Sequence, residues 1–172
     1  MHARTQPSQN VTARHRSQLG TSTQLRTIAG PWASSEAYRT DQFLSEFATY
    51  LNGFRWDWYV TLTHRYDTSK TASERHFVET FARTLGLRAQ KPIHWFYAVE
   101  GVDDIRPHVH ALLAVPPSVQ PIHIHNAWGR GQTKILPYIP CGGAAGYVPK
   151  GLDDPEAKWG FSRTLPPPLS LT

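Results

Sequence analysis

A pair of histidines in the segment 107–113, which reads PHVHALL, carries the clearest chemical signal in the sequence. Residues two apart on a β-strand project from the same face, so His108 and His110 can offer two imidazole nitrogens to one cation. Segments 93–100 and 108–115 are expected to form an antiparallel hairpin, and the register that pairs Glu100 with His108 leaves a loop of seven residues. That register sets the carboxylate on the face of both imidazoles. The three side chains predict a partly open site for a divalent metal whose remaining positions go to water or phosphate oxygens.

Histidine pairs of this spacing are common, and His108 and His110 could equally be satisfied or merely exposed side chains. A second pair, His123 and His125, shows how little the spacing alone means. That pair falls in a predicted helix, where residues two apart diverge, so we predict no metal site there.

A tyrosine and a lysine three residues apart, Tyr147 and Lys150, form a second candidate group. On a helix this spacing places the phenol beside the ammonium group. Tyrosine has a reference pKa near 10, so it is a weak nucleophile at neutral pH unless a cation or a metal-bound phosphate assists it. Pro149 disfavours a helical conformation at the preceding residue, and the turn that holds the pair is expected to kink or to end there. An ordinary exposed Tyr and Lys is the simpler alternative.

Alternating helix and strand patterns surround these groups. Apolar residues at helical spacing predict a helix that begins at Ser35 and Glu36 and ends at Asn52 and Gly53. From Trp56 the period becomes two, which predicts a strand with Trp56, Trp58, Val60 and Leu62 on one face and Asp57, Tyr59, Thr61 and Thr63 on the other.

The remaining elements follow the same logic. A second helix is expected from a capping box at Thr71 and Glu74 to a terminator at Gly86. After the hairpin, the pattern predicts a short helix over 119–128 and a strand over 133–138. It also predicts a helix over 142–151 that is weakened by its glycines.

Length and composition indicate one domain with two tails. The chain has 172 residues, with 18 Lys and Arg against 13 Asp and Glu, a formal charge of +5 that permits a polyanionic partner without requiring one. We predict a flexible basic tail over 1–33, which is either a phosphate-contacting arm or a solubilising leader, a domain over 34–163, and a proline-rich tail over 164–172.

The cysteine count and the hydropathy pattern bound the environment. A single cysteine, Cys141, excludes an intrachain disulfide and a cysteine-based zinc cage. The N-terminus lacks the apolar run of a signal peptide, and no stretch of the sequence approaches the length of a membrane span. We therefore expect a cytoplasmic protein without a membrane partner.

The order of these motifs resembles the three successive motifs of the HUH endonuclease superfamily, in its rolling-circle replication initiators. A strand that reads WYVTLT over 58–63 is followed by Glu100, by the HVH segment at 108–110, and by Tyr147 with Lys150. The resemblance spans residues 56–163 and includes Ser162 and Arg163 after the tyrosine segment. The positions four before and four after Tyr147 are Gly143 and Gly151, so the chain resembles the members with a single catalytic tyrosine.

The resemblance implies a ferredoxin-like α+β domain, whose central antiparallel sheet carries the HUH motif and whose helices flank it. It implies that Tyr147 is the nucleophile, that Lys150 assists it, and that Glu100, His108 and His110 hold Mg²⁺ or Mn²⁺. We also predict DNA contacts from Thr61, Thr63, Arg106 and Arg163.

The implied reaction is nicking and joining of single-stranded or hairpin DNA through a 5′-phosphotyrosine link, at the start of rolling-circle replication of a plasmid or phage. No P-loop motif is present, so strand separation is expected to need a separate helicase. Three alternatives stay open: a single-tyrosine HUH transposase, a non-catalytic DNA-binding module whose aromatic residues stack on bases, and a small metallohydrolase that uses a metal-bound water.

Overall fold

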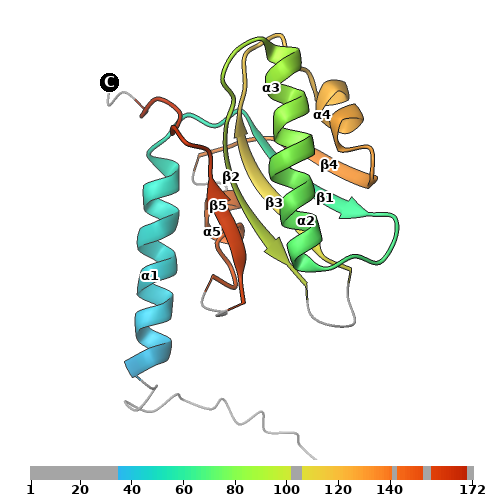
Figure 1. The fold of residues 1–172 in the computed structure, drawn as a ribbon. Helices are drawn as coiled ribbons and strands as arrows, with labels where there is room; N and C mark the ends of the chain where they lie inside the picture. Colours follow the sequence, from blue (N-terminus) through green and yellow to red (C-terminus); the bar gives the residue numbers. More distant parts are fainter. Residues whose placement is uncertain (1–34, 102–105, 141–142, 153–155, 170–172) are drawn as a thin grey trace, which may run out of the picture. The chain divides into compact units, whose positions relative to one another are not determined.

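A computed structural model describes residues 35–101, 106–140, 143–152 and 156–169. In this part of the chain a five-stranded antiparallel sheet is covered by helices (Figure 1). The predicted tail over 1–33, Cys141 and most of the predicted hairpin loop lie outside the described residues.

The sheet has the strand order β4-β1-β3-β2-β5, and every neighbouring pair is antiparallel. A helical segment connects β1 to β2 and another connects β3 to β4, which gives the β-α-β-β-α-β order of ferredoxin-like folds. The predicted α+β class with a central antiparallel sheet is therefore confirmed. The strands are β1 (Trp58–His64), β2 (His94–Glu100), β3 (His108–Ala114), β4 (Gly131–Pro137) and β5 (Lys158–Phe161).

The fifth strand was not predicted from the sequence. β5 pairs with β2 at the edge of the sheet, and it has only four residues, too few for a period of two to stand out. Gly160 of β5 is paired with Tyr97 of β2. A Cβ added at this glycine would lie 3.2 Å from the ring of Tyr97, so the glycine leaves room for that ring.

One face of the sheet is covered by a helical segment over residues 70–89 and by α4 (Pro121–Trp128). The segment consists of α2 (Lys70–His76), a π-helical stretch η1 (Phe77–Ala82) and α3 (Arg83–Ala89). Its buried side chains pack with alternate residues of the strands in one cluster, whose largest fully buried members are Trp128, Phe77, Phe81, Leu62, Leu85, Leu113, Ile124, Val60 and Val109.

The predicted limits of this helix were wrong at both ends. Ser69 is the N-cap, and its hydroxyl accepts a hydrogen bond from the backbone N–H of Ala72 at 3.1 Å, so the chain enters the helix before the predicted capping box. At the other end the helix continues through Gly86 to a left-handed Gln90. Leu85 and Ala89 are both buried, and this burial outweighs the helix-propensity cost of a glycine, about 1 kcal/mol.

The opposite face of the sheet packs against α1 (Ser35–Asn52) and a single helical turn, α5 (Ala144–Tyr147). The predicted limits of α1 are confirmed. The cluster on this face comprises Leu51, Trp56, Phe96, Ala98, Leu112, Ala114, Tyr138, Ala145 and Val148.

The spacing predicted that Trp56 shares a face with Val60 and Leu62, and this prediction was wrong. β1 begins only at Trp58, so the alternation of faces does not extend back to Trp56. Its indole packs on the α1 side and donates a hydrogen bond to the backbone oxygen of Leu51 at 2.8 Å.

The described part of the proline-rich C-terminal segment is extended and hydrogen-bonded to the turn after α1. The backbone N–H of Arg55 donates to the oxygen of Pro167 at 3.0 Å, and that of Leu169 donates to Gly53 at 2.9 Å. None of the helices in the described part of the chain combines the length and the apolar character that a membrane span requires.

Candidate active site

The α1 face of the sheet changes from apolar to polar along each of the three inner strands. On β3 the side chains of this face are Ala114 and Leu112, which are buried in the cluster, followed by His110 and His108. On β2 the same face ends in Glu100, and Glu100 is paired with His108. The predicted register of the hairpin is therefore confirmed, and it sets the carboxylate and both imidazoles on one face.

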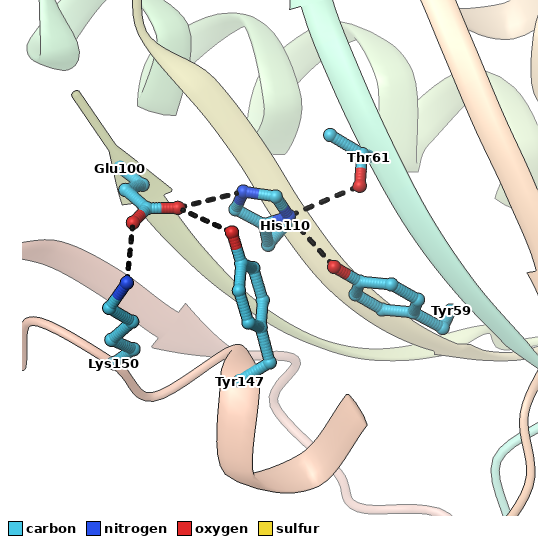
Figure 2. A network of polar contacts seen from close by, with 6 residues as sticks. All are labelled: Tyr59, Thr61, Glu100, His110, Tyr147 and Lys150. Atoms are coloured by element: carbon cyan, nitrogen blue, oxygen red, sulfur yellow. Dashed lines mark hydrogen bonds and ion pairs between the residues drawn. The ribbon is translucent and has the colours of Figure 1, made fainter. Parts of the chain in front are cut away.

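His110 lies at the centre of a network of polar contacts (Figure 2). Its Nε2 lies 3.0 Å from a carboxylate oxygen of Glu100. Its Nδ1 lies 3.1 Å from the hydroxyl of Tyr59 and 3.2 Å from that of Thr61, both on β1. The rings of Tyr59 and His110 are close to parallel, at an angle of 11°. These contacts fix the orientation of the imidazole from both sides.

Burial makes the neutral form of His110 the preferred one. The residue is 6% exposed, and desolvation lowers its pKa, although the nearby Glu100 acts in the opposite direction. A neutral imidazole can donate from Nδ1 to a hydroxyl of Tyr59 or Thr61 and present a lone pair at Nε2. That lone pair faces Glu100, which is an arrangement that a cation between the two groups would stabilise.

His108 has a ring nitrogen without a hydrogen-bond partner among the described residues. This nitrogen, Nδ1, is buried. Buried imidazole nitrogens normally find a partner, so an orphaned one beside Glu100 and His110 fits a ligand of a metal ion.

The side chains as they stand do not form a closed metal cage. In the described ranges, no three His, Cys, Asp or Glu side chains lie close enough together to hold an ion. The ring centroids of His108 and His110 are 6.5 Å apart, and Glu100 contacts His110 directly. Binding by all three would require side-chain rotation that opens the Glu100–His110 contact. The two imidazoles and the carboxylate nevertheless suit a divalent metal with open positions.

Tyr147 and Lys150 reach the same carboxylate from the other side of the site (Figure 2). The Tyr147 hydroxyl donates to one Glu100 oxygen at 3.4 Å, and the Lys150 Nζ lies 4.0 Å from the other oxygen. Both distances are long, so these contacts are weak in this arrangement. The negative charge of Glu100 raises the pKa of the Tyr147 phenol, with burial as a smaller cause. The free site therefore holds the phenol protonated.

The helix predicted over 142–151 is much shorter than expected. α5 begins after Gly143, which has a left-handed φ of 89°, and it ends at Tyr147. The helix ends before Pro149, as the proline predicted. In the turn that follows, the backbone N–H of Lys150 donates to the backbone oxygen of Tyr147 at 3.1 Å. The turn still brings the two side chains together, with the Lys150 Nζ 5.6 Å from the centre of the Tyr147 ring.

The four residues predicted to contact DNA lie in different places. Thr61 is bonded to His110, and Thr63 is paired with His108. Arg106 is exposed near this end of the sheet, and it is ion-paired with Asp67 at 3.1 Å. Arg163 follows β5 beside the start of β2, so the structure does not bring it to the site.

Tyr59 is a site residue that the sequence reasoning missed. Its alternation with Thr61 and Thr63 predicted that the three side chains share a face. That shared face could have indicated that Tyr59 lies near the site. His123 and His125 lie on α4 and diverge, as their helical spacing predicted: His123 accepts from the Gln120 backbone, and His125 contacts Thr133.

The larger of the two described cavities, of about 870 Å³, is not at these residues. It is lined by Trp58, His94 and Ala114, which mark the opposite end of the inner strands. The polar network instead lies at the other end of the inner strands, where Tyr147 and Lys150 are exposed.

Comparison with known protein families gives a match that covers the whole site. A family model described as replication-associated protein ORF2 matches residues 57–155, which is more than half of the chain. No curated protein matches the chain. No solved structure matches it either.

Proposed function

Because the chain belongs to the replication-associated protein ORF2 family, we propose that it is a single-tyrosine HUH endonuclease that starts rolling-circle replication by nicking one DNA strand. The family implies that the chain acts on DNA in replication. The region matched by the family model contains every residue of the polar network.

One observation carries the proposal: Glu100 is the shared partner of a buried histidine, a tyrosine and a lysine. His110, Tyr147 and Lys150 come from two different parts of the chain, and all three have atoms within 4.0 Å of the Glu100 carboxylate. A structural role alone does not require a phenol, an ammonium group and an imidazole around one partly exposed carboxylate.

Glu100, His108 and His110 would hold the metal. A bound Mg²⁺ or Mn²⁺ supplies a Lewis acid that polarises the scissile phosphate. The buried His110 is held by Tyr59 and Thr61, so its Nε2 is oriented toward the site before any ion arrives.

Tyr147 would attack the phosphorus atom through its phenol oxygen. The new bond joins that oxygen to the phosphorus, and the bond from phosphorus to the 3′-oxygen breaks. The phenol loses a proton and the 3′-oxygen gains one, so the products are a 5′-phosphotyrosine and a free 3′-hydroxyl. The phosphotyrosine ester conserves the energy of the broken linkage, and a later 3′-hydroxyl can displace Tyr147 and reseal the strand.

Lys150 would stabilise negative charge on the phosphate. Its ammonium group is exposed, and it lies over the Tyr147 ring, 5.6 Å from the ring centre. A cation at this position favours the phenolate that the Glu100 charge disfavours in the free site.

The direct test uses labelled single-stranded DNA with manganese. A covalent adduct between protein and DNA, visible on a denaturing gel, is the expected result. A non-catalytic DNA-binding module would give no adduct, and a metallohydrolase would cleave without one.

The form of the substrate should matter strongly. No P-loop motif is present, and a tyrosine on a single helical turn needs a phosphate whose neighbouring bases can splay apart. We expect nicking of one sequence as a single strand or within a supercoiled plasmid, and little nicking of the same sequence as relaxed duplex. A separate helicase would then extend the opened region. Equal rates on all three substrates would contradict this requirement.

The hydroxyls on Nδ1 of His110 should contribute to metal affinity. Thr61→Val keeps the shape of the side chain and removes one hydroxyl, and Tyr59→Phe removes the other. Loss of such outer contacts typically costs roughly 10- to 100-fold in metal affinity or activity, so we expect about that effect from the double variant. Manganese titration measures it, and Thr133→Val, which removes a hydroxyl beside His125, serves as the control. An unchanged manganese affinity would show that these hydroxyls do not support the site.

A further inference from the structure

A second, smaller pocket lies on the other face of the sheet, at the end where the candidate active site is. Its volume is about 280 Å³. His64, the last residue of β1, lines it and packs against Trp128 of the cluster on the α2 and α4 face. The full lining is His64, Thr68, Ala72, Arg75, His76, Glu79, Thr80 and Arg130.

The pocket has the side chains of an anion site. Arg75 and Arg130 line it, and neither guanidinium has an ion-pair partner among the residues the structure describes. Two threonine hydroxyls, those of Thr68 and Thr80, add neutral donors. Within the described ranges Glu79 is the one acidic residue of the lining, so positive charge predominates.

A buried donor without a partner points to a missing ligand. His64 is 8% exposed, and its Nε2 has no hydrogen-bond partner in the part of the chain that the structure covers. Its ring lies 4.8 Å from that of Trp128 and 6.0 Å from that of His76, while the Nε2 of His76 contacts the Trp128 backbone oxygen. Burial lowers the pKa of both histidines and so favours the neutral ring of His64, which in the tautomer protonated at Nε2 has an N–H to donate. An unsatisfied buried polar group is costly, and an oxyanion in the pocket could accept its hydrogen bond.

We propose that this pocket binds a phosphate group of the DNA strand that runs past the nicking centre. The inference rests on the proposed function. His64 directly follows Thr63, which is paired with His108, so the pocket and the metal-donor row lie at the same end of the sheet, on its two opposite faces. A strand leaving Tyr147 around the end of the sheet would pass here. Paired guanidinium groups are well suited to hold a phosphate.

The test measures binding without chemistry. Single-stranded DNA is titrated into the Tyr147→Phe protein in the presence of a chelator, over a range of salt concentrations. Adding Arg75→Gln and Arg130→Gln should weaken binding roughly tenfold or more, and should reduce the salt slope on single-stranded DNA by about 0.7 for each phosphate that the variant no longer neutralises. Arg83→Gln, an exposed arginine on α3 that does not line the pocket, is the matched control. A decrease in affinity no larger than that of the control would overturn the proposal.

Two further measurements identify the source of the phosphate. Inorganic phosphate should shift the ring resonances of His64 in an NMR titration. Oligonucleotides with one neutral methylphosphonate, moved stepwise from the nick, should bind more weakly at one position, and this effect should disappear in the Arg75 and Arg130 variant. A shift with inorganic phosphate but no sensitive position would overturn the assignment to DNA in favour of free phosphate, and no response to either probe would overturn the site. Because no measurement needs cleavage, failure of the nicking proposal remains distinguishable.

Discussion

Tyr147→Phe is expected to abolish strand cleavage and the covalent DNA adduct, with a loss of roughly 10³-fold or more, as is typical when a nucleophile is removed. The substitution keeps the ring and deletes only the attacking oxygen. Because the residue is 44% exposed and its hydroxyl makes one long contact, stability and DNA affinity should change little. Adduct formation on a denaturing gel and DNA binding by fluorescence anisotropy measure the two effects.

Tyr66→Phe is the matched control, since Tyr66 is an exposed tyrosine outside the network. It should form the adduct at the rate of the unmodified protein. Undiminished adduct in the Tyr147 variant would place the nucleophile elsewhere, and Tyr59, whose hydroxyl contacts His110, would be the next candidate.

His110→Asn should produce the second large effect. The substitution removes the Nε2 that faces Glu100, so manganese affinity should fall by more than the roughly 100-fold that loss of an outer partner can cost. Cleavage should fall in parallel. Glu100→Gln and His108→Asn are expected to act in the same direction because they remove the other two donors. Manganese binding, followed by electron paramagnetic resonance, gives the affinity without DNA.

His125→Asn is the control, because His125 belongs to a histidine pair of the same spacing that forms no shared site. Protonated imidazole cannot bind a metal, so affinity should also decline as the pH falls through the histidine range. A structure with manganese bound away from Glu100, His108 and His110 would refute the assignment.

The hairpin that carries the site could be predicted because its side-chain period is two. A strand has only two faces. A register that pairs Glu100 with an even-numbered residue of β3 therefore places its side chain on the face of His108 and His110. The limits of α1 were equally accessible, since Asn52 and Gly53 provide a strong stop signal.

Features that depend on tertiary packing could not be predicted from the sequence in the same way. The helix passes through Gly86 because Leu85 and Ala89 find a buried face, and no local signal reports that face. β5 is too short to show a period, and it exists because β2 offers an edge. The contact of Tyr59 with His110 depends on the pairing of β1 with β3, which lies outside the hairpin.

The residues proposed to hold the metal and the proposed nucleophile lie in different kinds of element. Glu100, His108 and His110 are on strands that have hydrogen-bonded neighbours on both sides, so separating them requires opening the sheet. Tyr147 is on one helical turn between Gly143 and Pro149. Few backbone hydrogen bonds hold a turn of this length, and Ala145 and Val148 anchor it in the cluster on the α1 face. We expect it to open at a lower free energy than the sheet. In the proposed reaction the turn would unwind with a DNA end attached while the sheet stays folded, which would let the tethered end swing toward the strand it will join.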